Sequence, residues 1–365
     1  MSSINDPTAL RIIDANLNRA REALRVMEEY ARFALDDRSL TQALKDARHG
    51  LAEVVGKLEH PPLDPPLGRG EASGTLLRAR DIVGDVGREV STAAEYQRAG
   101  AADVALAAAK RLGEALRAIE EYGKTIDPAF AAEIEKLRYR GYELERRLTI
   151  TIDAVGRFGH ARLYVLLTEA LCHGDWYETA EACLRGGADC LQLREKDLSD
   201  RELLDRAQRL ADLCHDHDAV FIVNDRPDVA AISGADGVHL GQDDMPVSAA
   251  RRVIPPHGLV GKSTHTSEQI EAAIEEVPDY LAVGPMFATP TKPQDHIAGP
   301  ETLAAARRQT ALPLVAIGGI TDSNAADVLS SAPCCVCVCQ AVIAQPDPEA
   351  SAARLKSMID EASAD

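Results

Sequence analysis

The chain of 365 residues is long enough for two domains, and its 45% hydrophobic residues can bury a large core. Its net charge of −18 repels phosphate backbones and anionic membranes, which argues against nucleic acid as the main partner. No run approaches the roughly 20 apolar residues that span a bilayer, and the N-terminus lacks the basic and apolar regions of a secretory signal.

Residues 8–150 have the pattern of helices, and strand-like runs of Val and Ile are scarce there. In the first stretch apolar residues recur at helical intervals: Leu10, Ile13, Leu17, Leu24 and Met27. The segment 57–75 is rich in Pro and Gly, so it predicts a long loop. We therefore expect an all-α helical domain over residues 1–150.

This helical region contains an internal repeat. The pattern R-x-x-E-A-L-R-x-x-E-E-Y occurs at 19–30 and again at 111–122, and a further helical stretch follows each copy. Two related helix pairs predict a pseudo-symmetric bundle. The charged residues of the repeat either pair along a solvated helix face or line a polar pocket between the two copies. Four residues of the intervening segment would join such a pocket: Arg78, Arg80, Asp81 and Asp85.

After about residue 160, short apolar runs alternate with helical stretches. Eight runs occur, at 163–167, 190–193, 220–223, 237–240, 259–261, 280–283, 314–317 and 335–339. Continuous apolar runs are typical of parallel strands covered on both faces. Eight of them with intervening helices predict an α/β fold, a (β/α)8 TIM barrel over 160–365. A doubly wound open sheet is the alternative, which the count of eight disfavours.

The eight cysteines all follow residue 170 and lie in apolar or helical stretches. This placement indicates reduced, mostly buried thiols and a cytoplasmic protein. Cys335, Cys337 and Cys339 would share one face of a strand. Because no second cysteine cluster and no His ligand adjoin this run, we expect these thiols to pack in the core rather than to hold a metal.

Polar residues gather at the C-terminal ends of the predicted strands. These ends meet at one mouth of a TIM barrel, where active sites form. Cationic side chains at this mouth are typical of a phosphate-binding site. Two carboxylates beside them are typical of a Mg²⁺ site, in which the ion completes its coordination shell with water and phosphate oxygens. The cations are Arg194, Lys196 and Lys292, and the carboxylates are Asp225 and Asp244. The alternative is a buried network in which these charges only pair with one another.

Two other features predict phosphate binding. Gly318 and Gly319 follow the seventh run, where glycines let backbone N–H groups approach a phosphate. Thr289, Thr291 and Lys292 offer two hydroxyls and a cation on one loop. Such a loop is typical of a phosphate clamp, and an ordinary connecting loop is the alternative.

In the motifs that contain these residues, the second half of the chain resembles thiamine phosphate synthase. Six motifs carry the resemblance in chain order: QLREK (192–196), VND (223–225), GVHLGQDD (237–244), GKSTHT (261–266), GPMFATPTK (284–292) and AIGGI (316–320). The resemblance implies that Mg²⁺ assists the joining of two small molecules, a pyrimidine diphosphate and a thiazole phosphate. Pyrophosphate would leave in a dissociative substitution, which needs no nucleophilic Ser or Cys.

The resemblance also implies a role for each matching residue. The pyrimidine diphosphate would be held by Gln192, Arg194, Lys196, Asn224, Ser263 and Lys292. Mg²⁺ would be bound by Asp225 and Asp244. The thiazole phosphate would be held by Thr289, Thr291 and the backbone of Gly319. The catalytic residues would be Arg194, Lys196, Ser263 and Lys292, because they stabilise charge on the leaving group. His239 and His265 either orient substrate or are structural.

One position departs from the family pattern. The eighth strand of the family ends in Ile-Ser before Ala, whereas Cys339 and Gln340 precede Ala341 here. The hydroxyl that helps to hold the thiazole phosphate is therefore missing, although backbone contacts could persist.

The N-terminal half resembles the helical domain that is fused to this synthase in some bacteria. The twelve-residue repeat and the segment 80–87 carry that resemblance. It implies either phosphorylation of hydroxymethylpyrimidine phosphate or a substrate-binding, dimerising or regulatory role. Homo-oligomerisation is compatible with the sequence, which does not fix the oligomeric state. Rival interpretations of the barrel are a thiazole tautomerase and a non-catalytic binding protein, and the complete set of cations and carboxylates argues against both.

Overall fold

The computed structural model describes residues 6–59, 76, 98–289 and 296–364, and the chain divides into two compact units, Met1–Thr149 and Ile150–Asp365. Four residues expected in a pocket between the repeats lie outside the described residues: Arg78, Arg80, Asp81 and Asp85. No described helix is both long and apolar enough to cross a membrane.

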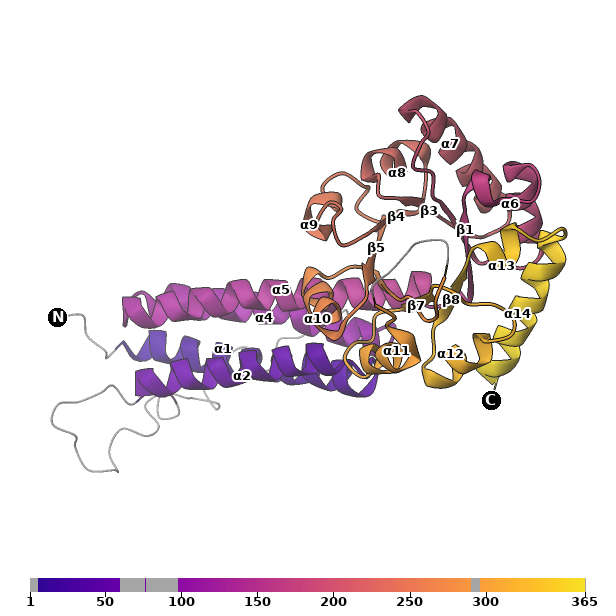
Figure 1. The fold of residues 1–365 in the computed structure, drawn as a ribbon. Helices are drawn as coiled ribbons and strands as arrows, with labels where there is room; N and C mark the ends of the chain where they lie inside the picture. The colour runs from indigo at the N-terminus through magenta and orange to yellow at the C-terminus, as the bar shows by residue number, and fades with distance from the viewer. Residues whose placement is uncertain (1–5, 60–75, 77–97, 290–295, 365) are drawn as a thin grey trace. The chain divides into compact units, whose positions relative to one another are not determined.

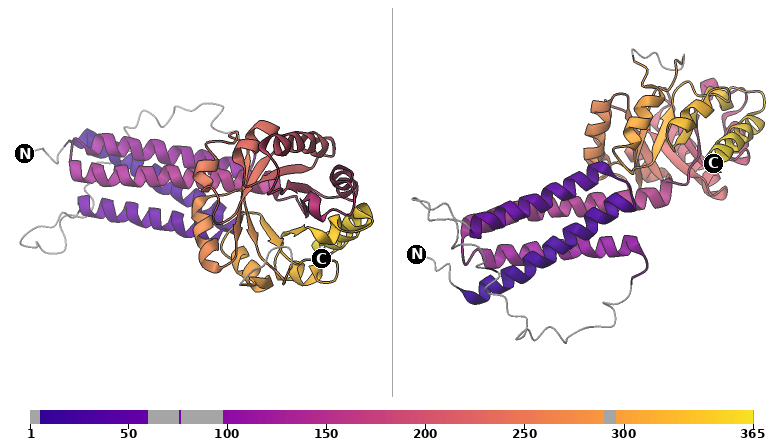
Figure 2. Two further views of the ribbon diagram at one scale, coloured as in Figure 1. Left: turned by 45° about the horizontal axis from the view of Figure 1, so that its top comes forward. Right: turned by 90° about the horizontal axis from the view of Figure 1, so that it is seen from below.

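The first unit is built from long helices that run side by side (Figures 1 and 2). They are α1 (Pro7–Phe33), α2 (Arg38–Glu59), α4 (Ala101–Gly123) and α5 (Pro128–Phe158), the last of which ends in the second unit. The side chain of Asp6 caps α1 by accepting a hydrogen bond from the amide of Thr8 at 2.9 Å, and Pro7 opens the helix. The buried face of α1 packs mainly against α4.

Each copy of the repeated pattern forms an ion pair with the helix that follows it. Glu28 of α1 pairs with Arg48 of α2 at 3.0 Å, and Glu120 of α4 pairs with Arg138 of α5 at 2.7 Å. Glu28 and Glu120 occupy the same position of the repeated pattern, so each copy joins its helix to the next one. Burial opposes ionisation of Glu120, but hydrogen bonds from Arg138 and Lys124 hold its pKa below the ordinary value.

The second unit is a closed barrel of eight parallel strands in chain order, which confirms the predicted (β/α)8 fold (Figure 2). The strands are β1 (Leu163–Leu167), β2 (Cys190–Leu193), β3 (Val220–Asn224), β4 (Gly237–Leu240), β5 (Leu259–Thr264), β6 (Tyr280–Val283), β7 (Leu314–Ile317) and β8 (Cys335–Val338). Pairing of β1 with β8 closes the barrel, with Leu163 opposite Val336.

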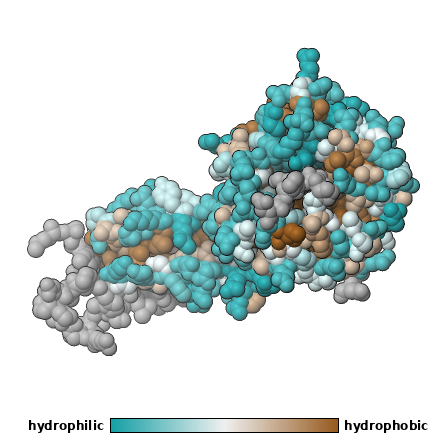
Figure 3. Space-filling view, in the orientation of Figure 1, coloured by the Kyte–Doolittle hydropathy of each residue, from teal (hydrophilic) through white to brown (hydrophobic). Residues whose placement is uncertain are grey.

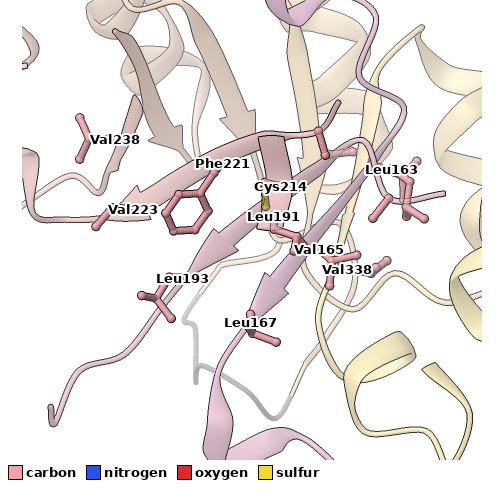
Figure 4. Packing of buried hydrophobic residues seen from close by; sticks show 14 of the residues in the cluster. Leu163, Val165, Leu167, Leu191, Leu193, Cys214, Phe221, Val223, Val238 and Val338 are labelled. Carbon is pink, nitrogen blue, oxygen red and sulfur yellow. The ribbon is translucent and has the colours of Figure 1, made fainter. Parts of the chain in front are cut away.

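Helices cover the outside of the barrel. They are η3 (Glu169–Leu171), α6 (Trp176–Arg185), α7 (Asp200–Asp216), α8 (Pro227–Ser233), α9 (Val247–Ala250), α10 (Ser267–Glu276), α11 (Gly299–Arg307), α12 (Ala325–Ser331), α13 (Gln340–Ile343) and α14 (Pro348–Ala364). The larger apolar cluster lies between these helices and the strands, and Figure 4 shows part of it around Leu191 and Phe221. In Figure 3 the visible surface of the barrel unit is largely hydrophilic, with small apolar patches.

A second cluster fills the inside of the barrel. Phe158, the last residue of α5, stacks on Tyr280 with ring centroids 4.4 Å apart and planes 10° apart. Cys335 and Cys337 belong to this inner cluster, and all eight cysteines are free thiols. Both side chains are buried in the core, as predicted, and burial raises the pKa of both thiols well above the ordinary value. Cys339 follows the end of β8 instead of sharing its face, and it packs partly buried against the larger cluster.

Candidate active site

A cavity of about 370 Å³ opens at the C-terminal ends of the strands. The residues around it come from loops and strand ends far apart in the chain, because parallel barrel strands all end on the same face. The cavity is lined by nine of the predicted site residues: Gln192, Arg194, Lys196, Asn224, Asp225, Asp244, Ser263, Thr289 and Gly319. Thr291 and Lys292 lie outside the described residues.

Lys196 and the two carboxylates meet at the cavity. Lys196 follows β2 and donates a hydrogen bond to Asp225 Oδ2 at 2.6 Å. Asp225 follows β3 directly and has a φ of 63°, a left-handed conformation that a non-glycine residue rarely adopts. Its amide donates to the carbonyl of His239 at 2.8 Å, which fixes this conformation against β4. Such strain is typical of functional sites, where the surrounding structure holds a side chain in place.

Asp225 and Asp244 lie close enough to share a hydrogen bond. Burial and the neighbouring Asp225 raise the pKa of Asp244 above the ordinary value, although the amide of Gly241 opposes this by donating to its Oδ2 at 2.6 Å. Two carboxylates held together in this way repel each other when both are ionised. A cation between them would remove that repulsion.

The donor set fits Mg²⁺. Among the residues that the structure describes, no group of three His, Cys, Asp or Glu could hold a metal ion. A site with only two protein carboxylates suits Mg²⁺, which usually keeps several waters and takes further ligands from substrate phosphates. It does not suit structural Zn²⁺, which takes four protein ligands. Asp225 and Asp244 are the residues that would hold the ion.

Ser263 lies at the end of a hydrogen-bonded line of side chains. Its Oγ is 2.8 Å from His239 Nε2, and His239 Nδ1 is 3.0 Å from the hydroxyl of Tyr280. Burial lowers the pKa of His239 to about 4, so the ring is neutral near pH 7. His265, in contrast, places its Nδ1 at 2.6 Å from the carbonyl of Gly284. Each histidine therefore has a partner in the protein.

The backbone around Gly318 and Gly319 requires glycine. Their φ values are 99° and 69°. A Cβ on Gly319 would lie 2.7 Å from the carbonyl oxygen of Phe287 and 2.8 Å from that of Ala288. The carbonyl of Gly319 accepts a hydrogen bond from Asn324 Nδ2 at 3.0 Å, which fixes the turn. Cys339 and Gln340 line the same cavity, so the departure from the family pattern falls within the site.

The sequence reasoning missed residues that support the site, one of which, Tyr164, also lines the cavity. Glu195 does not line the cavity and accepts a hydrogen bond from the amide of Glu169 at 2.7 Å, which anchors the chain between Arg194 and Lys196. Tyr164 and Tyr280 extend the line from His239 into the barrel. The available signal was a tyrosine inside a run predicted to be buried, because a buried phenol usually has a hydrogen-bond partner.

Comparison with known proteins finds a family for each half of the chain. Residues 163–342 match the family described as thiamine monophosphate synthase, and residues 11–147 match the ThiD2 family. A thiamine-phosphate synthase of Synechocystis is 39% identical over 354 residues, covering 97% of each chain. That of Rhodopirellula baltica is 40% identical over 91% of this chain and 87% of its own length.

A solved structure agrees with the barrel. Thiamine phosphate pyrophosphorylase from Pyrococcus furiosus is 33% identical and superposes with a TM-score of 0.52, covering 55% of this chain and 96% of its own. Relatives that match over nearly the full length carry both the helical and the barrel regions. The chain belongs to the thiamine-phosphate synthase family.

Proposed function

We propose that the barrel joins a pyrimidine diphosphate to a thiazole phosphate, which gives thiamine phosphate and pyrophosphate. The observation that carries the proposal is the meeting of Arg194 and Lys196 with the carboxylate pair Asp225 and Asp244 at one cavity. Cations alone would suit many phosphorylated ligands. Cations beside a carboxylate pair suit a diphosphate bound together with a divalent metal.

The reaction breaks one bond and forms another. The bond between the pyrimidine methylene carbon and the pyrophosphate oxygen breaks, and its electron pair leaves with pyrophosphate. The resulting pyrimidine methylene cation is attacked by the thiazole nitrogen, whose lone pair forms the new C–N bond. Arg194, Lys196 and Lys292 stabilise the negative charge that grows on the leaving group, which lowers the barrier to its departure.

The remaining predicted residues bind and orient. Gln192, Asn224 and Ser263 hold the pyrimidine diphosphate, and Thr289, Thr291 and the Gly319 backbone hold the thiazole phosphate. Asp225 and Asp244 would hold Mg²⁺, which would neutralise charge on the diphosphate. Orientation matters because the nitrogen must reach the methylene carbon before water does.

Pyrophosphate release by the purified full chain tests the proposal. We expect release only when both substrates and Mg²⁺ are present, and formation of an equal amount of thiamine phosphate. Tautomerisation of a thiazole cannot produce pyrophosphate, so release also separates this proposal from the tautomerase alternative. A folded protein that is stabilised by the substrates but releases no pyrophosphate would favour a binding protein instead.

Gly319→Ala is expected to raise the KM for the thiazole phosphate by about tenfold, with a smaller change in the KM for the pyrimidine diphosphate. The added Cβ would press against two carbonyl oxygens at a φ that alanine rarely adopts, so the loop must move. Steady-state kinetics with each substrate varied in turn measures the effect.

Gly174→Ala is the matched control, because a Cβ there meets nothing within 4 Å. Equal changes in both KM values, or none, would contradict a role of the Gly319 backbone in binding the thiazole phosphate.

The same proposal covers the class of substrate, the partners and the location of the protein. The substrates are small molecules, nucleic acid is not a partner, and the protein acts in the cytoplasm. Self-association into a homo-oligomer is tested by light scattering of the full chain. Phosphorylation of hydroxymethylpyrimidine phosphate by the helical unit stays an alternative activity, which ATP consumption that depends on that substrate would reveal.

A further inference from the structure

Five side chains form a continuous hydrogen-bonded line through the inside of the barrel, from Gln192 on β2 to Ser263 on β5. Gln192 Nε2 lies 2.5 Å from the hydroxyl of Tyr164, which lies 3.1 Å from the hydroxyl of Tyr280. The Tyr280 hydroxyl is 3.0 Å from His239 Nδ1, and His239 Nε2 is 2.8 Å from Ser263 Oγ. Both ends reach the cavity, so the line joins two residues to which the proposed function assigns substrate contacts.

Four side chains of the line have almost no exposed surface, although Tyr164 and His239 line the cavity as the two ends do. Gln192, Tyr164, Tyr280 and His239 have exposed fractions of 3%, 1%, 0% and 7%. Their neighbours in the inner cluster are apolar side chains and thiols, and the thiol of Cys190, which contacts Tyr164, is only a weak acceptor. Buried polar groups in such surroundings satisfy one another, so each hydrogen in the line has a defined place.

The first donor fixes the direction of every later bond. The nitrogen of the Gln192 amide can only donate, so Tyr164 accepts from it. A phenol has a single hydrogen, which Tyr164 donates to Tyr280 and Tyr280 donates in turn to His239 Nδ1. A neutral imidazole that accepts at Nδ1 carries its hydrogen on Nε2, and this hydrogen is donated to Ser263 Oγ.

We propose that Tyr164 and Tyr280 are positioning residues that, through His239, fix Ser263 as a hydrogen-bond donor toward the cavity and Gln192 as an acceptor toward it. Ser263 Oγ already accepts from His239, so its own hydrogen points to an acceptor such as a diphosphate oxygen. The amide nitrogen of Gln192 donates a hydrogen bond to Tyr164. Its carbonyl oxygen Oε1 is then the acceptor for a donor such as an amino group on a pyrimidine. The identity of these ligands rests on the proposed function, whereas the direction of the line does not.

The direction of these hydrogen bonds also argues against Ser263 as a nucleophile. A serine that attacks substrate needs a base that can take its proton. His239 Nε2 carries a hydrogen in this arrangement and has no free lone pair to offer, although it lies at the distance of a Ser–His pair. Ser263 therefore serves the departing pyrophosphate as a donor.

Tyr280 is held in place on several sides. Phe158 stacks on one face of its ring at 4.4 Å, and the His239 ring stacks at 5.6 Å and 23°. A Cβ on Gly261 of β5 would overlap the Tyr280 ring, so the glycine provides the space that the phenol occupies. The hydroxyl at the centre of the line is therefore fixed by packing as well as by hydrogen bonds.

The tautomer of His239 tests the inference directly. We would label the histidines of the full chain with ¹⁵N and read the ring nitrogens by NMR near pH 7, with His239→Gln to identify the signals of this residue among the ten histidines. We expect the hydrogen on Nε2. A hydrogen on Nδ1, or a doubly protonated ring at this pH, would overturn the proposed direction.

A single change at the far end should reverse the line. In Gln192→Glu, at a pH where the introduced carboxylate is ionised, the carboxylate can only accept. Tyr164 would then donate to it, Tyr280 would donate to Tyr164, and His239 would carry its hydrogen on Nδ1. We expect the tautomer to switch, even though three hydrogen bonds separate position 192 from His239.

Two variants separate this relay from a simple effect of charge. Asn224→Asp makes the same amide-to-carboxylate change at the end of the neighbouring strand, outside the line, and should leave the hydrogen on Nε2. Adding Tyr280→Phe to Gln192→Glu removes the central hydroxyl and should abolish the switch. A switch in Asn224→Asp, or an unchanged tautomer in folded Gln192→Glu, would contradict the proposal.

Kinetics connect the line to the reaction. We expect Tyr280→Phe to lower kcat by about tenfold with little change in the KM for the thiazole phosphate, because Ser263 loses its fixed orientation toward the leaving group. An unchanged kcat in the folded variant would overturn the positioning role. Because the NMR measurement needs no turnover, absence of pyrophosphate release by the unmodified chain would count against the proposed function alone.

Discussion

Replacing Asp225 and Asp244 together with asparagine is expected to lower kcat/KM by at least about a hundredfold, because the Mg²⁺ proposed to neutralise the leaving group could no longer bind. The two carboxylates lie close together, and burial and the neighbouring Asp225 raise the pKa of Asp244, so the pair gains more from a divalent cation than separate exposed carboxylates would. Asparagine keeps the shape of each side chain and removes its charge. Pyrophosphate release at increasing Mg²⁺ concentration measures the loss.

Asp243→Asn is the matched control, because Asp243 is the exposed neighbour of Asp244 and does not line the cavity. Its kcat/KM should stay within about twofold of the unmodified chain. Mn²⁺ binding in the presence of pyrophosphate, followed by electron paramagnetic resonance, reports on the site without turnover. Unchanged Mn²⁺ binding by the double variant would show that the two carboxylates do not hold the metal.

The barrel could be predicted from the sequence because its signal is repeated eight times. Each strand is a short run such as Leu163–Leu167 or Cys190–Leu193, apolar throughout because helices cover one side and the inner core the other. The limits of single strands were less certain. β5 runs Leu259–Thr264, three residues beyond the predicted 259–261, because the polar Lys262 and Ser263 still pair with Leu281 and Ala282 of β6.

The mouth of the barrel was predictable for the same geometric reason. Residues at the ends of neighbouring parallel strands meet, so the positions of Asp225 after β3 and Asp244 after β4 in the chain are enough to predict that they lie together. The hydrogen-bonded line was not predictable as a unit, although a tyrosine in a buried run indicates that its hydroxyl has some partner. Tyr164 and Tyr280 lie in runs whose apolar character hides them, and contact between β1 and β6 across the barrel leaves no spacing in the sequence.

Hydrogen-bond direction is a property of a whole line rather than of one residue. Ser263 and His239 looked like separate candidates in the sequence, one for phosphate binding and one of undecided role. Their relation depends on Gln192, whose amide nitrogen fixes the tautomer of His239 through two phenols. A sequence gives the members of such a line, but only their distances show that they act together.

Phe158→Ala is expected to lower the free energy of unfolding of the barrel unit by about 3–5 kcal/mol, because it leaves a cavity in the inner cluster. Phe158 is 1% exposed and stacks on Tyr280 at 4.4 Å, and its ring also meets that of Tyr164 edge-on at 6.2 Å. Burial of a phenylalanine of this kind is among the largest single contributions to a core. The chain has one tryptophan, Trp176, in α6, so its fluorescence during urea unfolding reports on the barrel unit.

Phe33→Ala, at a side chain of the helical unit with an exposed fraction of 73%, is the control and should shift the unfolding transition reported by Trp176 by less than about 0.5 kcal/mol. The two substitutions therefore separate the loss of packing from the loss of a phenyl group as such. Phe158→Ala should also lower kcat, because Tyr280 loses the ring that holds its hydroxyl against His239. A variant with unchanged stability would mean that neighbouring side chains refill the space. If kcat were also unchanged, the position of Tyr280 would be fixed by Gly261 and His239 alone, without the help of Phe158.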